Sequence, residues 1–129
     1  MTANERASRT IMVVDDEQDI REMMRVLLEE DGYCVLEAEN GQQAVEMARS
    51  KSPDLILMDL SMPVLDGFAA TRLLREKTKP GDLPIIAVTA HDTPEHRTSA
   101  SDAGINEYLT KPIDFAKLDQ LLDRFLKTA

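Results

Sequence analysis

The sequence predicts an α/β domain: a five-stranded parallel sheet with five helices on its two faces. Two observations support this fold class. Short apolar runs alternate five times with amphipathic or polar helical segments along the 129 residues, which is the order of repeated strand–helix units. The runs are apolar throughout and lack the in–out alternation of a half-exposed strand, as is typical of a parallel sheet covered on both faces. The length is that of one domain.

The predicted strands are brief, and a polar residue follows each of them. They cover residues 10–14, 33–38, 55–58, 84–88 and 107–109. The first helix has the clearest signal, because its apolar residues recur at i, i+3, i+4, i+7 and i+8 and end near Gly32. These residues are Ile20, Met23, Met24, Leu27 and Leu28, and we expect Met23, Met24 and Met47 to fill the core.

Capping and helix-breaking residues bound the other helices. Asn40-Gly41 opens the second helix and Ser52-Pro53 ends it. The third helix runs from about Phe68 to Glu76, and the fourth from Pro94 to Ala103, where Gly104 stops it. The last helix carries Phe115, Leu118, Leu121, Leu122 and Phe125 on one face. Residues 1–9 are polar without periodicity and are interpreted as a flexible N-terminal tail before a domain at 10–127.

Charge and composition narrow the function classes. The chain has 24 acidic and 15 basic residues, a net charge of −9, which repels nucleic acid and anionic membranes. A basic partner, a bound cation or simple solubility would each account for that charge. We find no membrane-spanning apolar run and no signal peptide. Cys34 is the only cysteine, so no internal disulfide forms. We expect a cytoplasmic protein in which Cys34 is buried and has no redox role.

Polar residues at the strand ends are the candidate site. Asp15 and Asp16 follow the first strand, Asp59 the third, Thr89 the fourth and Lys111 the fifth. In an open parallel sheet the carboxyl ends of the strands meet at one edge, where ligands bind. The alternative for the first pair is that it caps the following helix.

Three gathered carboxylates need a cation or raised pKa values. At ~5 Å and an effective dielectric of ~20, each pair costs about 3 kcal/mol. Oxygen ligands favour Mg²⁺, and the absence of neighbouring His or Cys argues against zinc. An ionised Asp, a divalent cation, a lysine and a hydroxyl together fit phosphoryl transfer. Asp59 would be the nucleophile, Lys111 and the metal would neutralise phosphoryl oxygens, and Thr89 would donate a hydrogen bond.

Four motifs together resemble the receiver domain of bacterial two-component response regulators, including the chemotaxis regulator. They are Asp15-Asp16-Glu17, the run from Asp59 through Leu-Ser-Met-Pro-Val-Leu-Asp to Gly67, Val88-Thr89-Ala90, and Tyr108-Leu-Thr-Lys111-Pro112. The resemblance covers about residues 10–127. It implies a flavodoxin-like doubly wound fold with strand order 2-1-3-4-5.

The resemblance also implies a role for each matching residue. Asp59 would accept a phosphoryl group from a histidine of a sensor kinase or a histidine phosphotransfer protein, as in a phosphorelay. Asp16, Asp59 and the backbone carbonyl of Ser61 would bind Mg²⁺ directly, and Asp15 through water. Lys111 would contact the phosphoryl group, and the Lys111–Pro112 peptide bond would be cis.

Switching and output follow from the same resemblance. Thr89 would turn toward the phosphoryl group, and Tyr108 would move from an exposed to a buried rotamer; a simply packed aromatic is the alternative for Tyr108. Ser61 and His91 stand where hydrolysis of the aspartyl phosphate is tuned. The output face would comprise residues 94–103, 107–109 and 115–125, bind an output protein, and offer one route to a homodimer.

Other function classes fit the residues less well. A receiver module cut from a hybrid sensor kinase or larger regulator is the leading alternative, because the segments 89–91 and 67–72 resemble receivers of hybrid kinases. A metal-dependent phosphatase would need a second acid where Ser61 stands. A flavin- or nucleotide-binding module would need a phosphate-binding loop in place of Asp15-Asp16-Glu17. A scaffold that keeps the fold but never turns over phosphate would not need the complete set of site residues. We therefore expect a signalling switch and not a true enzyme.

Overall fold

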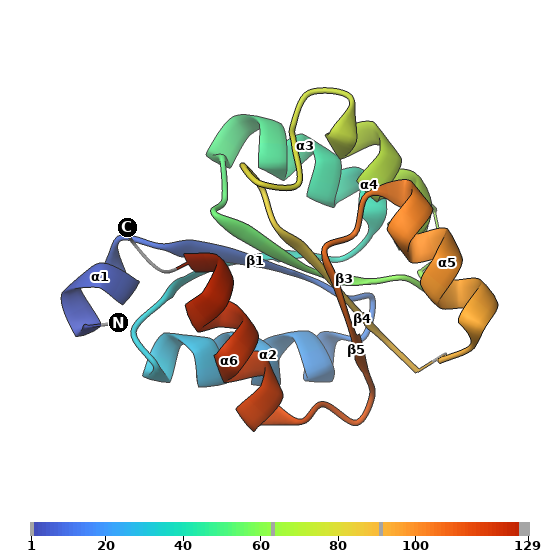
Figure 1. The fold of residues 1–129 in the computed structure, drawn as a ribbon. Coiled ribbons are helices and arrows are strands. Elements are labelled where there is room, and N and C mark those ends of the chain that lie inside the picture. The colour runs from blue at the N-terminus through green and yellow to red at the C-terminus, as the bar shows by residue number, and fades with distance from the viewer. Residues whose placement is uncertain (1, 63, 91, 127–129) are drawn as a thin grey trace.

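The computed structural model describes residues 2–62, 64–90 and 92–126. Over these residues the chain forms one parallel sheet and six helices (Figure 1). The strands are β1 (Thr10–Val14), β2 (Cys34–Ala38), β3 (Leu55–Asp59), β4 (Ile85–Thr89) and β5 (Glu107–Thr110). The helices are α1 (Ala3–Ala7), α2 (Gln18–Glu30), α3 (Gly41–Lys51), α4 (Gly67–Arg75), α5 (Pro94–Ala103) and α6 (Phe115–Leu126).

The predicted topology is confirmed. The strand order is β2-β1-β3-β4-β5, and every neighbouring pair is parallel. Helices α3, α4 and α5 cover one face, and α2 and α6 cover the other (Figure 1). None of the helices in the described part of the chain has both the length and the apolar character needed to cross a lipid bilayer.

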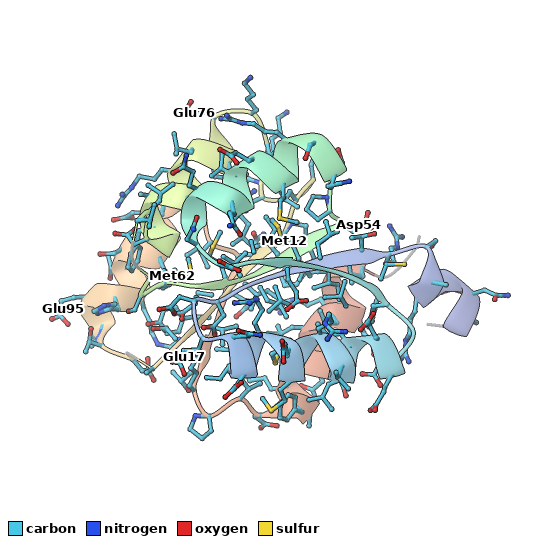
Figure 2. The ribbon with its side chains drawn as sticks, turned by 180° about the vertical axis from the view of Figure 1, so that it is seen from behind. Met12, Glu17, Asp54, Met62, Glu76 and Glu95 are labelled. Atoms are coloured by element: carbon cyan, nitrogen blue, oxygen red, sulfur yellow. The ribbon has the colours of Figure 1, made fainter. Side chains whose placement is uncertain are left out.

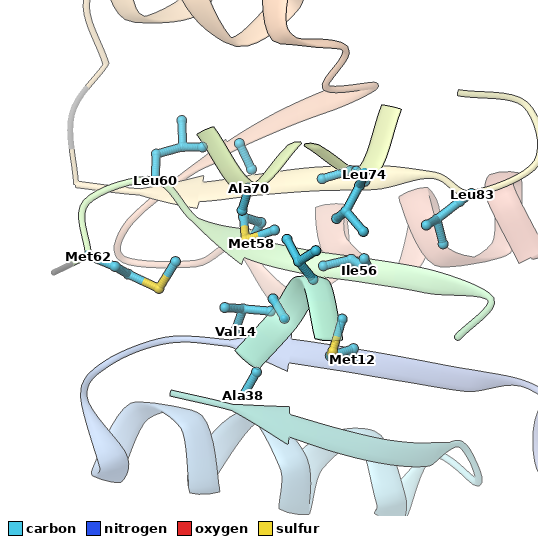
Figure 3. Close-up of a cluster of buried hydrophobic side chains, with 14 of the residues drawn as sticks. Met12, Val14, Ala38, Ile56, Met58, Leu60, Met62, Ala70, Leu74 and Leu83 are labelled. Atoms are coloured by element: carbon cyan, nitrogen blue, oxygen red, sulfur yellow. The ribbon is translucent and has the colours of Figure 1, made fainter. Parts of the chain in front are cut away.

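Two separate clusters of buried side chains fill the space between the sheet and its helices. Alternate residues of each strand point to opposite faces, so Met12 belongs to one cluster and Ile11 to the other. Figure 3 shows the cluster on the α3–α4 side, where Ile56 and Met58 of β3 meet Ala70 and Leu74. Because both faces are covered, the strands are apolar throughout, which is the pattern in the sequence.

Helix starts follow the capping residues of the sequence. The side chains of Asn40, Asp66 and Thr93 accept hydrogen bonds from the backbone N–H groups three residues on, at 2.9, 2.8 and 3.2 Å. Gly104 ends α5 with φ 104°, a left-handed conformation that favours glycine. The bounds of α5 match the prediction.

Three expectations are corrected. The chain has six helices and not five, because the segment interpreted as a tail contains α1. Thr2 caps that helix, and Arg6 anchors it by donating to the Asp31 carbonyl at 3.2 Å. Cys34 is exposed, because it begins the edge strand β2, which has a neighbour on one side only. Met23 is 47% exposed, because the covered stripe of α2 is narrower than its apolar pattern.

Candidate functional site

Asp15, Asp16 and Asp59 come together where β1 and β3 end. Each offers one carboxylate oxygen, and these oxygens lie within 4.8 Å of one another. Val14 is opposite Met58 in the parallel register, so Asp15 and Asp59, which follow them, lie side by side. In Figure 2 Glu17 and Met62, which follow β1 and β3, lie toward this end, and Asp54, which precedes β3, lies at the other. Asp15 and Asp59 are buried, whereas Asp16 is exposed.

Lys111, which follows the edge strand β5, contacts two of these carboxylates. Its Nζ lies 3.1 Å from Asp15 Oδ2 and 3.4 Å from Asp59 Oδ2. Its backbone N–H donates to the Thr89 carbonyl at 2.8 Å, which fixes the start of the side chain beside β4. The expected cis peptide bond to Pro112 is present. The structure therefore brings together the four charged residues that the strand ends predicted.

Burial and neighbouring charge act in opposite directions here. Burial raises the pKa of the Asp59 carboxyl, although the Ser61 N–H and the Lys111 ammonium act to lower it. Burial acts to lower the pKa of Lys111, but Asp59 and Asp15 outweigh it, and the pKa is raised. The lysine is therefore held as a cation next to an acid whose negative charge is under-stabilised. A further cation would relieve that imbalance.

The loop after β3 is held close to Asp59. The Ser61 N–H donates to Asp59 Oδ1 at 3.0 Å, and the Gly67 N–H donates to the Leu60 carbonyl at 3.2 Å. A Cβ on Gly67 would lie 2.4 Å from the Asp59 carbonyl oxygen, so only glycine allows α4 to begin this near the strand. Asp66 then caps the helix. The loop that carries Ser61 is thus fixed at both ends.

Thr89 stands at the expected edge of the sheet, whereas Tyr108 is already buried in this structure and not in the exposed rotamer from which it was expected to move. Asp59 is opposite Val88 in the register, so Thr89 ends β4 one residue beyond, at the same edge of the sheet. Thr89 is fully buried, and Tyr108 is 6% exposed in the middle of β5. His91 lies outside the described residues.

Arg21 is a residue that the sequence analysis missed. Its side chain is buried, its Nη1 donates to the Asp15 carbonyl at 2.9 Å, and its Nε pairs with Glu37 at 3.2 Å. Arg21 thereby fixes the end of β1 that carries the acidic pair. Its spacing of three from Met24 and seven from Leu28 places it on the core stripe of α2, and a charge at such a position is the signal that could have identified it.

The donor set fits a hard divalent cation. It contains carboxylate oxygens only, two from buried acids and one from the exposed Asp16, which is open to solvent. Mg²⁺ prefers few carboxylates and keeps several waters, and the exposure on the Asp16 side leaves room for them. Lys111 supplies one positive charge to the same site, which leaves the cluster short of neutralisation.

Comparisons with known proteins identify the family of this chain. The family model for the response regulator receiver domain matches residues 11–123. Protein PilH of Pseudomonas aeruginosa is 40% identical over 104 residues, which are 81% of this chain and 86% of PilH. The phosphate regulon regulatory protein PhoB of the same organism is 40% identical over 119 residues, which are 92% of this chain but 52% of PhoB.

A solved structure has a closely similar fold. The receiver domain of the sensor histidine kinase PA1611 from Pseudomonas aeruginosa, described with a magnesium ion coordinated in its active site cleft, superposes with a TM-score of 0.84. It is 37% identical, and the match covers 93% of this chain and 98% of that domain. The chain therefore belongs to the response regulator receiver domains of two-component systems, a family whose members are phosphoryl-accepting signalling switches.

Proposed function

We propose that Asp59 of this chain accepts a phosphoryl group from a phosphohistidine, with Mg²⁺ bound directly by Asp16, Asp59 and the Ser61 carbonyl and through water by Asp15. The observation that supports this most strongly is Lys111 Nζ placed between Asp15 and Asp59 within a cluster of three carboxylates. The donor would be a sensor histidine kinase or a histidine phosphotransfer protein. We also propose a cytoplasmic location, where such a phosphohistidine is available.

The chain's own residues have distinct parts in this reaction. A carboxylate oxygen of Asp59 forms the new P–O bond while the P–N bond of the phosphohistidine breaks, and the imidazole keeps the electron pair. Lys111 moves its contact from the carboxylates to a phosphoryl oxygen, and Thr89 donates to another oxygen. Bound Mg²⁺ would add charge neutralisation at the same oxygens. The Ser61 N–H holds Asp59 Oδ1 at 3.0 Å, which orients the other oxygen for attack.

The signal would leave the site through Thr89 and Tyr108. Thr89 ends β4 next to α5, and Tyr108 lies on the neighbouring strand β5. The only buried side chains of α5 are Ala100 and Ala103, so little apolar contact holds this helix in place. We propose that α5, β5 and α6 form the face that meets an output protein, or a second copy of the chain.

Intact mass after incubation with a small phosphodonor tests the proposal. Acetyl phosphate with Mg²⁺ should add one phosphoryl group that hydroxylamine removes. Asp59→Asn should abolish the addition, because an amide oxygen is a poor nucleophile. Asp82→Asn, which changes an exposed acid in a distant turn, is the matched control and should label normally. Labelling of the Asp59→Asn protein at another residue would refute Asp59 as the acceptor.

A further inference from the structure

The side chain of Arg97 covers the ring of Tyr108. The guanidinium carbon lies 4.6 Å from the ring centroid, within the range of a cation–π contact. Tyr108 is only 6% exposed, whereas the side chain of Arg97 is 49% exposed. The arginine is thus the outer layer over a ring that belongs to the strand beneath it.

No apolar side chain of α5 larger than alanine helps Arg97 to cover the ring of Tyr108. The buried residues of the helix are Ala100 and Ala103, which are too short to enclose a phenol ring. A surface recess of about 160 Å³ lies between α5 and β5, with Arg97 and Tyr108 in its lining. The ring therefore has space beside it, and the planar guanidinium closes its outer side.

Asp92 keeps the guanidinium in that position. It pairs with Arg97 Nε and stands in the connection from β4 to α5, three residues after Thr89. The pairing ties the cover over Tyr108 to the segment that leaves the phosphorylation site. A displacement of this connection would therefore move the arginine as well.

We propose that Arg97, held by Asp92, is a positioning residue that keeps Tyr108 buried and so sets how far the ring can still move on phosphorylation. The effect on phosphorylation rests on the proposed function, whereas the burial of Tyr108 by Arg97 does not. Planarity matters to the mechanism, because a flat guanidinium stacks on the aromatic face and covers it, whereas an ammonium contacts it only as a compact charge.

Tyrosine fluorescence isolates the ring. The chain has two tyrosines and no tryptophan, so a Tyr33→Phe parent reports Tyr108 alone. Acrylamide quenching of this parent should be weak, because the ring is buried. Arg97→Ala should raise the quenching constant about threefold, the effect expected from losing one exposed cation–π contact and its ion pair. Arg97→Lys should raise it too, since the charge stays but the planar cover is lost.

A double-mutant comparison tests the role of Asp92. Asp92→Asn should raise the quenching constant in the parent but add nothing in the Arg97→Ala background. Arg124→Ala is the matched control: Arg124 also stacks on a ring, Phe125 at 4.5 Å, and pairs with Glu107 at 2.7 Å. Its loss should leave the quenching unchanged. Equal quenching in the parent, Arg97→Ala and Arg97→Lys, at unchanged thermal midpoints, would overturn the proposal.

Beryllofluoride with Mg²⁺ tests the link to the switch. The quenching constant of the parent should change little, because its ring is already covered. The quenching constant of Arg97→Ala should fall toward the value of the parent. An identical response in both proteins would overturn the link. Intact mass with acetyl phosphate is measured on each variant, and a failure to label there would count against the proposed function and not against the hold on Tyr108.

Discussion

Lys111 is the residue on which the electrostatics of the site depend. Its ammonium lies within 3.4 Å of two carboxylates that burial leaves poorly solvated. The same charge that stabilises these acids repels a metal ion that approaches them. We therefore expect Lys111 to lower the affinity for a cation and to favour the binding of an anionic phosphoryl group.

Lys111→Ala should separate these two effects. Mg²⁺ should bind about tenfold more tightly, because one positive charge near the ion is lost. Labelling by acetyl phosphate should slow at the same time, since a phosphoryl oxygen loses its partner. Isothermal titration and time-resolved intact mass would measure the two effects. Lys117→Ala, an exposed lysine on α6, should alter neither, and weaker Mg²⁺ binding by Lys111→Ala would contradict this account.

The sequence predicted which of these side chains come together, because their positions follow from topology. A polar residue directly after a buried parallel strand can only emerge at one edge, which identified Asp15, Asp59 and Lys111. Arg21 was missed although its helical spacing places a charge on the core stripe of α2. Arg97 was missed for a different reason: its role depends on where a long side chain folds back, and helical spacing alone does not give that direction.

At the scale of elements, the start of α4 limits the geometry of the site. Gly67 packs against the last peptide of β3, with no room for a side chain. Gly67→Ala should lower the free energy of unfolding by about 2 kcal/mol and weaken Mg²⁺ binding, because backbone and not a flexible side chain would have to move.

Gly81→Ala is the control for that substitution. A Cβ at Gly81 meets nothing within 4 Å, so stability should stay the same or rise slightly. Urea unfolding and a Mg²⁺ titration would measure both variants. A Gly67→Ala protein as stable as the Gly81→Ala protein would show that the loop after β3 adapts freely.

A cluster of acidic residues where α2 and α6 meet makes the folded state relatively more stable at low pH. Burial and the nearby Asp31 and Asp123 raise the pKa of Asp119, although Arg6 acts to lower it. The folded state therefore holds a proton on Asp119 more tightly than the unfolded chain does. The ionised Asp119 carboxylate therefore destabilises the folded state. This destabilisation is absent below the ordinary pKa of about 3.9 and complete above the raised pKa.

Asp119→Asn should consequently raise the melting temperature at pH 7 by about 1 °C, a small gain because the group is exposed and screened. The gain should shrink as the pH falls below 4 and as salt is added. Asp102→Asn, on α5, serves as the control. Thermal melts between pH 3 and pH 8 would decide, and a gain that grows at low pH would contradict the predicted sign.

Element bounds were predictable wherever local chemistry sets them. Thr93-Pro94 and Gly104 delimit α5, and the structure places both ends there. Helix α1 was not predictable, since five polar and small residues carry no periodicity. Contacts distant in sequence hold it in place, among them the bond from Arg6 to the Asp31 carbonyl.

For the whole molecule, the question is how far a change at Asp59 reaches. We expect phosphorylation, or beryllofluoride with Mg²⁺, to alter amide hydrogen exchange across α5, β5 and α6. Thr89→Ala should still label at Asp59 but lose most of that change, because the hydroxyl that moves toward the phosphoryl group is gone. Exchange differences confined to the loops around the metal site in the wild type would refute this route.

The sheet divides the buried side chains into two separate clusters, one on each of its faces. Ile11 and Met12 are consecutive and both fully buried, yet each packs among a different set of partners. Residues of different clusters that lie more than about 10 Å apart and have no common partners contribute additively to stability, to within about 0.5 kcal/mol. Met12 and Ile56, which are paired across two strands and share one cluster, are expected to be non-additive. We therefore expect that the α2–α6 layer can be redesigned, or can diverge during evolution, without repacking of the layer that contains α3, α4 and α5.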